Sequence, residues 1–129
     1  MPTLLTKSQE NTLAAQKLVT KQMYTASVHC AYYGCFQHIK QILHNKLNFD
    51  YAKQDNANGK DSHLAILDEI VNKAPTPQQA KDIRNIFQWL KSERKRADYS
   101  IDIFKDTVSL DVISKSITLH FKLKEIWKI

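Results

Sequence analysis

The sequence predicts an all-α fold, an up-and-down bundle of about five helices that forms a single domain over residues 1–129. With two glycines and three prolines the chain has little turn chemistry, whereas a β-sandwich needs a turn signal about every ten residues. Apolar residues recur three and four positions apart over long stretches, which is the spacing of one helix face. The length suffices for one hydrophobic core but not for a second independent one.

The first two helices are expected from about Ser8 to Thr20, with Thr6 or Ser8 as cap, and from about Tyr24 to Leu47. The core side of the second helix is expected to carry Val28, Tyr32, Cys35, Phe36, Ile39, Leu43 and Leu47. Its other side is a polar but partly aromatic row of His29, Tyr33, Gln37, Lys40 and His44. Gly34 in mid-helix costs about 1 kcal/mol relative to alanine, so we expect another helix to approach closely there.

Three further elements follow. The segment from Phe49 to Asp61, with Asn58-Gly59, is expected to be a polar loop. A third helix is expected from Ser62 to about Ala74, and a fifth from about Ser109 to Trp127. The core face of the third helix is expected to hold Leu64, Leu67, Ile70 and Val71. The fifth helix is expected to bury Leu110, Val112, Ile113, Ile117, Leu119, Leu123 and Ile126.

The fourth helix has the strongest local start. Thr76 and Gln79 have the spacing of a capping box, and Pro77 occupies the first helical position, so a helix should run from here to Asp98 or Tyr99. Its apolar stripe is Ile83, Phe87, Leu90, Arg94 and Ala97. We predict that the first three of these are buried.

An arginine within an apolar stripe has two interpretations. The aliphatic stem of Arg94 could pack on the bundle while its guanidinium reaches water, or the arginine could serve a function. Asp98, four residues on, can pair with it on the helix surface, but this order of charges adds only a few tenths of a kcal/mol. Asp98 is therefore expected to bind another group as well, such as the Tyr33 hydroxyl, a backbone amide or a partner chain.

The same stretch resembles a known family. Leu90-Lys91-Ser92-Glu93-Arg94-Lys95-Arg96-Ala97-Asp98-Tyr99 is similar to the Leu-x-x-x-Arg-x-x-Ala-Asp-Tyr signature of small prokaryotic HEPN-domain proteins, often found beside minimal nucleotidyltransferases. Ala31-Tyr32-Tyr33-Gly34-Cys35-Phe36 resembles the family's Tyr-Tyr-Ala-x-Phe segment. Ser62-His63 resembles the Ser-His that opens its next helix. The three stretches occur in the family's order.

The resemblance implies a HEPN-like bundle that acts as a binding module for RNA or nucleotide, or for a nucleotidyltransferase antitoxin partner. It also implies a homodimer, with the working surface around Arg94, Asp98 and Tyr99. If the polar row of the second helix faces Arg94, His29 and Tyr33 would complete a nucleotide-sized site of cation, imidazole and ring. Lys91 and Lys95 belong to the densest basic cluster and are expected to contribute to the same binding surface.

Members of the family that cut RNA place a histidine about four to six residues after the arginine, as acid–base beside a phosphate-binding cation. Here Tyr99, Ser100 and Ile101 stand in that region, and tyrosine, whose unperturbed pKa is about 10, is a poor base at neutral pH. No catalytic residue is therefore assigned. The alternatives are an RNA-cleaving toxin of a toxin–antitoxin pair, its histidine supplied by His29, His63 or a partner, and a purely structural interaction protein.

The composition indicates which class of partner to expect. The net charge of +6 and pI near 9.3 favour acidic partners, most obviously nucleic acid. Cys30 and Cys35 lie on different sides of one predicted helix, so free thiols and a cytoplasmic location are expected. No apolar run approaches membrane-spanning length. Neither a metal site nor a cofactor is expected, because Cys35 and His38 have no matching ligand pair elsewhere.

Overall fold

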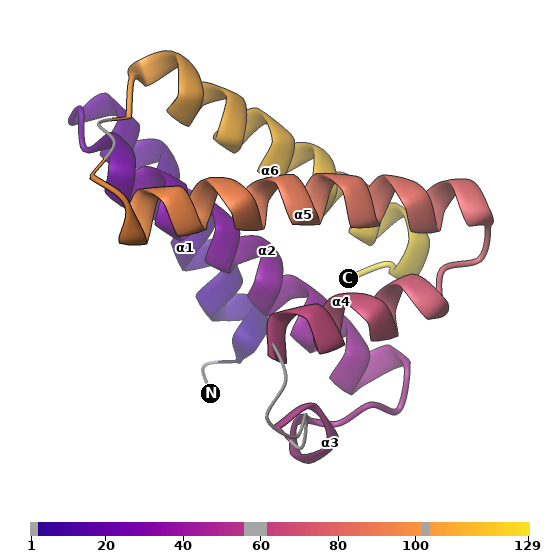
Figure 1. Cartoon of the computed structure of the whole chain (residues 1–129). Helices are drawn as coiled ribbons and strands as arrows, with labels where there is room; N and C mark the ends of the chain where they lie inside the picture. Colours follow the sequence, from indigo (N-terminus) through magenta and orange to yellow (C-terminus); the bar gives the residue numbers. More distant parts are fainter. Residues whose placement is uncertain (1–2, 56–61, 102–103) are drawn as a thin grey trace.

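A computed structural model describes residues 3–55, 62–101 and 104–129 and shows an all-α bundle (Figure 1). The described residues form six helices, one more than predicted: α1 (Leu4–Thr20), α2 (Tyr24–Lys46), α3 (Tyr51–Asp55), α4 (Ser62–Asn72), α5 (Pro77–Tyr99) and α6 (Asp106–Trp127). The additional helix, α3, is a single turn within the segment predicted to be a loop. The predicted turn at Asn58-Gly59 lies outside the described residues.

α2 is the central helix of the bundle, with α1 antiparallel and α6 parallel to it. Ser27 near the start of α2 donates its hydroxyl hydrogen to the Ala15 carbonyl late in α1, at 2.7 Å. Ser109 near the start of α6 donates likewise to the Tyr24 carbonyl, at 3.1 Å. α5 crosses α2 obliquely between α4 and α6, as Figure 1 shows.

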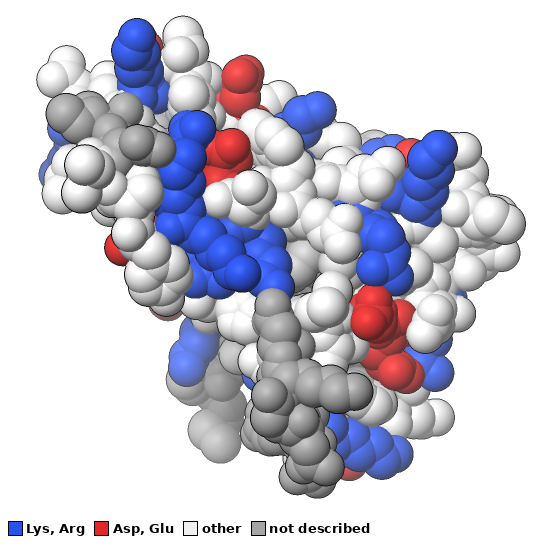
Figure 2. Space-filling view, in the orientation of Figure 1, with Lys and Arg blue, Asp and Glu red and all other residues white. Residues whose placement is uncertain are grey.

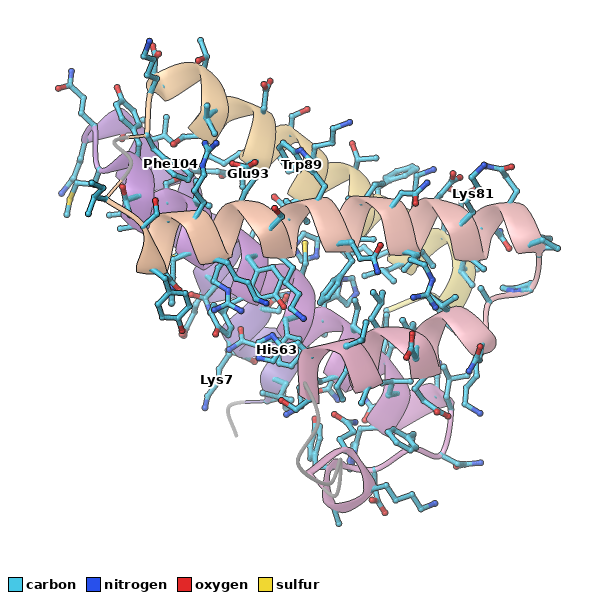
Figure 3. All side chains as sticks on the ribbon, viewed as in Figure 1. Lys7, His63, Lys81, Trp89, Glu93 and Phe104 are labelled. Atoms are coloured by element: carbon cyan, nitrogen blue, oxygen red, sulfur yellow. The ribbon has the colours of Figure 1, made fainter. Side chains whose placement is uncertain are left out.

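The core lies where α2, α4, α5 and α6 meet. Ile83, Phe87 and Leu90 of α5 are fully buried, as their spacing predicted. Phe87 packs against the ring of Tyr32 on α2, with centroids 5.3 Å apart. Trp89, on the side of α5 that faces α6 in Figure 3, packs at the edge of this core.

Two helix starts show how capping set the boundaries. The α5 start is as predicted: Thr76 is the N-cap and its hydroxyl oxygen accepts from the Gln79 backbone N–H at 3.1 Å. The α1 start was predicted wrongly, because the helix begins at Leu4 with Thr3 as its N-cap. Ser8 is instead buried within α1.

α6 also differs from the prediction. It begins at Asp106 rather than near Ser109, and it buries a narrower stripe than expected. Leu110 and Ile117 are exposed, because α2 and α5 cover only the arc that contains Val112, Leu119 and Leu123. On α4, Leu64 is likewise exposed at the edge of the predicted core face.

α1 approaches α2 closely at Gly34, which confirms the close helix approach that the sequence predicted at this glycine. A Cβ there would lie 2.8 Å from Thr12 Oγ1 and 3.2 Å from the Ser8 carbonyl oxygen. The Ser8 hydroxyl donates to the Gly34 carbonyl at 2.6 Å. Gly34 is therefore covered within its own chain and offers no surface to a second copy.

Three helices are followed by a residue in the left-handed region of backbone conformation, and none of these residues is glycine. They are Gln22 (φ 61°), Asn48 (φ 55°) and Lys128 (φ 65°). Past the end of α1, the Met23 N–H reaches back to the Leu18 carbonyl at 2.8 Å. Past the end of α2, the Phe49 N–H does the same to Leu43, at 2.9 Å. None of the described helices combines the length and apolar character needed to cross a bilayer.

Candidate functional site

Arg94 is the centre of the candidate site, and its guanidinium does not reach out to water. The side chain is only 7% exposed. The guanidinium carbon lies 5.0 Å from the ring centroid of Tyr32, 5.6 Å from Tyr33 and 5.9 Å from Tyr99, within the range of cation–π attraction. Burial disfavours its charge, but Tyr33, Tyr32 and Asp98 favour it, and the net pKa lies above the ordinary arginine value. Arg94 is therefore a permanent cation enclosed by rings.

One side of Arg94 is linked to His29 through Asp98. An Arg94 terminal nitrogen lies 3.6 Å from Asp98 Oδ2, the surface pairing that the sequence predicted. Asp98 also lies 2.9 Å from Nδ1 of His29 on α2, a partner that the sequence did not suggest. Because a carboxylate only accepts, His29 Nδ1 carries the proton, and in the neutral ring Nε2 is left as an acceptor. The carboxylate thus fixes both the orientation and the tautomer of the imidazole.

The other side of Arg94 is linked to His63 through Tyr32. The Arg94 guanidinium packs against the Tyr32 ring, and the hydroxyl of Tyr32 lies 2.6 Å from His63 Nδ1. His63, labelled at the start of α4 in Figure 3, also stacks on Phe36 with centroids 4.1 Å apart. Each of the two histidines therefore reaches Arg94 through one intermediate side chain.

A cavity opens beside the His29–Asp98 pair. It has a volume of about 720 Å³ and is lined by Gln22, Met23, Tyr24, Thr25, Ala26, His29, Cys30, Asp98 and Phe104. Most of these side chains are apolar or aromatic, while His29 and Asp98 supply polar atoms at one wall. Pockets of about 300–1,000 Å³ with a few fixed polar groups are typical of small-molecule sites.

The basic residues of α5 flank this centre. Figure 2 shows a continuous band of Lys and Arg side chains over the C-terminal half of α5, the part that contains Lys91, Arg94, Lys95 and Arg96. Lys91 and Lys95 line a separate hollow of about 410 Å³ between α5 and α4. This hollow shares no lining residue with the 720 Å³ cavity.

The structure brings five of the predicted site residues together, Arg94, Asp98, Tyr99, Tyr33 and His29, whereas Lys91 and Lys95 line a separate hollow. His29 and Tyr33 do face Arg94, and their rings lie 4.7 Å apart. Tyr99 is 78% exposed at the end of α5, so its ring is accessible from outside. Tyr32 and His63 were not among the predicted binding residues: Tyr32 was interpreted as core, and His63 was named only as a histidine that could serve the alternative cleavage reaction. Their place in two of the stretches that resemble the family was the available signal.

The described residues do not bring potential metal ligands together. Within residues 3–55, 62–101 and 104–129, no group of three or more His, Cys, Asp or Glu side chains could hold a metal ion. The Cys35 thiol donates to the Ser116 carbonyl at 3.5 Å, and burial raises its pKa. Burial also raises the pKa of the Cys30 thiol, and both cysteines are free. Neither thiol is therefore an activated nucleophile.

Comparisons with protein-family models, with curated proteins and with solved structures find no match to this chain.

Proposed function

We propose that this protein is a HEPN-like binding module for RNA or nucleotide, and that the ligand sits where α2 and α5 meet around Arg94. One observation carries the proposal: a buried cation surrounded by three tyrosine rings is tied through Asp98 to His29, beside a cavity large enough for a nucleotide. Guanidinium groups bind phosphate, and aromatic rings stack on bases.

The hydrogen bonding of Arg94 supports this proposal. Its Nε is buried and has no hydrogen-bond partner among the described residues. A buried donor without an acceptor is unusual in a folded protein. A phosphate oxygen is a suitable acceptor, and the Tyr99 ring, 5.9 Å from the guanidinium carbon, is exposed.

The outer part of the proposed site is basic. Lys91 and Lys95 are one helical turn apart and extend the positive charge of Arg94 along α5. In this proposal they bind flanking phosphates of an RNA strand, while the cavity beside His29 takes a base. A free nucleotide would use the cavity and Arg94 but not the two lysines.

The test is binding of a fluorescein-labelled single-stranded RNA, followed by anisotropy at several salt concentrations. Tyr99→Ala should weaken binding by about 1–3 kcal/mol, as expected for loss of one stacked base. Lys91→Ala with Lys95→Ala should reduce the salt slope by about two. Lys115→Ala, which removes an exposed cation from α6, is the matched control. If the wild type shows no salt-dependent binding, a purely structural role is supported, and if both test variants bind like the wild type, the RNA uses another surface.

The same experiment separates RNA from nucleotide. AMP should compete with the labelled RNA if the cavity beside His29 takes a base, and the Lys91/Lys95 variant should retain AMP binding. If AMP neither binds nor competes while RNA does, the ligand is a strand held by the basic surface alone.

A second candidate function, metal-independent RNA cleavage, is favoured by the His29–Asp98 pair. The family's arginine-plus-spacer pattern lacks its histidine in sequence, but His29 supplies an imidazole near Arg94 from α2. Asp98 orients that ring as a carboxylate orients a general base, with Nε2 available to take a 2′-hydroxyl proton. Arg94 would then stabilise the charge that develops on the phosphate.

We expect the purified protein not to cut RNA in the presence of a chelator, because the family's own acid–base position holds no histidine. The assay compares wild type with Arg94→Ala, His29→Ala and His63→Ala. Wild-type cleavage that is lost in Arg94→Ala and in one histidine variant would overturn this expectation and would identify the acid–base residue. Retained RNA binding in His29→Ala would show that the loss is chemical.

Two partner proposals rest on the same resemblance: a homodimer and a nucleotidyltransferase antitoxin. The exposed apolar side chains at the end of α5, Tyr99 and Ile101, support an interface next to the site. Co-expression with a minimal nucleotidyltransferase, followed by size-exclusion chromatography of wild type and Ile101→Glu, tests the second partner.

A further inference from the structure

A second polar cluster lies where α1, α2 and α6 meet, separate from Arg94. His38 is 1% exposed, and its Nδ1 lies 2.8 Å from Nδ1 of His120. His38 Nε2 lies 2.9 Å from the main-chain oxygen of Ile129. His120 Nε2 lies 3.1 Å from the Thr12 hydroxyl. These contacts form one chain of hydrogen bonds from the end of α6 to α1.

The proton positions in this chain follow from its two ends. The Ile129 oxygen can only accept, so His38 Nε2 carries a proton and its Nδ1, in a neutral ring, accepts from His120. His120 Nε2 then faces the Thr12 hydroxyl, whose hydrogen is also directed at the Ser8 carbonyl, at 2.9 Å. Burial lowers the pKa of His38 to about 4 and that of His120 to about 3, with Lys124 adding to both shifts. Both imidazoles are therefore neutral at physiological pH.

Next to His120 is a cavity of about 340 Å³ between α1 and α6. Its lining is Leu5, Ser8, Gln9, Thr12, Leu13, Gln16, His38, Ile117, His120 and Lys124. The lining contains no Asp or Glu. Leu13 and Ile117 are among the large apolar side chains that the fold leaves exposed. The cavity therefore has apolar walls, one cationic side chain and no anionic one.

The polarity of the cavity differs between its two ends. α1 runs antiparallel to α6, and Thr12 lies opposite His120. Lys124, one turn after His120, is therefore on the side of Gln9, whereas Ile117, one turn before it, is on the side of Leu13. Among the described residues, Lys124 has no carboxylate within ion-pair distance. The end with Gln9 is cationic, and the other end, which holds Leu13, Gln16 and Ile117, is uncharged.

We propose that this cavity binds a small monocarboxylate with a short apolar chain, its carboxylate on Lys124 and its chain against Leu13 and Ile117. Charge complementarity selects the anion, because a cationic ligand would meet Lys124 and the neutral imidazoles without any acidic partner. The volume is near the lower limit of ligand pockets, which excludes a helix of a partner protein. This binding does not depend on Arg94 or on RNA.

Hexanoate is the probe, with 1-hexanol and hexylammonium as ligands of equal chain length and different charge. Isothermal titration at neutral pH should detect hexanoate binding, weaker hexanol binding and no hexylammonium binding. Lys124→Gln should raise the hexanoate Kd about fivefold, which corresponds to one partly exposed charge pair. Lys115→Gln, an exposed cation elsewhere on α6, should leave the Kd unchanged.

A second variant tests the end of the cavity that holds Leu13 and Ile117. Ile117→Gln should weaken hexanoate and hexanol alike, since Ile117 is exposed enough for the fold to tolerate glutamine. Binding should also shift the ring-proton NMR signals of His120, which lies in the wall. Equal affinity for hexanoate and hexanol, or equal effects of Lys124→Gln and Lys115→Gln, would overturn the proposal.

Discussion

His29 and Asp98 are 69 residues apart in sequence, yet the imidazole Nδ1 lies 2.9 Å from the carboxylate and joins α2 to the last turn of α5. The contact gives Asp98 two partners, because Arg94 lies 3.6 Å from its other oxygen. The carboxylate therefore sits between a buried cation and an exposed imidazole. Any ligand that binds Arg94 from this side also meets His29.

Arg94 should affect stability and binding through different parts of its side chain. Arg94→Ala removes a packed stem as well as the charge and should lower the free energy of unfolding by about 2–4 kcal/mol. Arg94→Met keeps most of the stem and should cost less. Urea unfolding measures both. RNA affinity should be lost equally in the two variants, and RNA binding retained by Arg94→Met would contradict a role for the guanidinium.

Gly34→Ala should destabilise the bundle although alanine is the better helix former. The new Cβ meets Thr12 Oγ1 at 2.8 Å, and such overpacking costs about 1–3 kcal/mol. Adding Thr12→Ala removes the closest atom and should recover part of the loss. Thermal unfolding of the single and double variants measures this coupling, and purely additive effects would argue against the close contact.

Stability should fall as the pH drops through the range between about 6.5 and 4. The pKa of His38 is lowered to about 4 and that of His120 to about 3, while in the unfolded chain both are near 6.5. In this range the unfolded chain binds more protons than the folded one, so protons favour unfolding. Above this range the stabilisation from the neutral pair is fully present.

Urea unfolding at several pH values checks this for wild type and for a His38→Gln, His120→Gln double variant. The carboxylates that also titrate in acid are the same in both proteins, so a difference in pH dependence between them comes from the two histidines. The double variant should therefore lose much of the pH dependence. An unchanged slope in the double variant would mean that other groups cause the acid sensitivity.

The proposed homodimer should be sensitive to the end of α5. Ile101 is 99% exposed and Tyr99 is 78% exposed, and a two-fold interface uses the same patch twice. Sedimentation at tens of micromolar should show a dimer in wild type and a shift to monomer in Ile101→Glu. Leu110→Glu, which changes an exposed apolar residue of α6, is the control. A 15.0 kDa species alone in wild type would contradict the dimer.

The sequence predicted those parts of the fold that local spacing determines. Ile83, Phe87 and Leu90 are buried because the three–four spacing already places them on one side of a helix. Spacing does not reveal how wide an arc the neighbouring helices cover, and for this reason Leu110 and Ile117 were wrongly expected to be buried.

The sequence indicated which residues belong to the candidate site, but not which of them contact one another. Arg94 stood out as a cation on an apolar stripe. Its links to His29 and His63 depend on how α2, α4 and α5 cross, which one sequence does not reveal. Tyr32 illustrates the limit: burial was predicted from its spacing, but not that its ring would lie against Arg94 while its hydroxyl contacts a histidine.

The left-handed residues Gln22 and Asn48 have a consequence for how the bundle assembles. Each carries a conformational cost of about 1–2 kcal/mol that glycine would not, but each also has fewer conformations to lose on folding. The junction from α1 to α2 is consequently a short, stiff turn. Such a turn limits the angles between α1 and α2, which keeps Ser27 within reach of the Ala15 carbonyl and Gly34 against Ser8 along the same pair of helices.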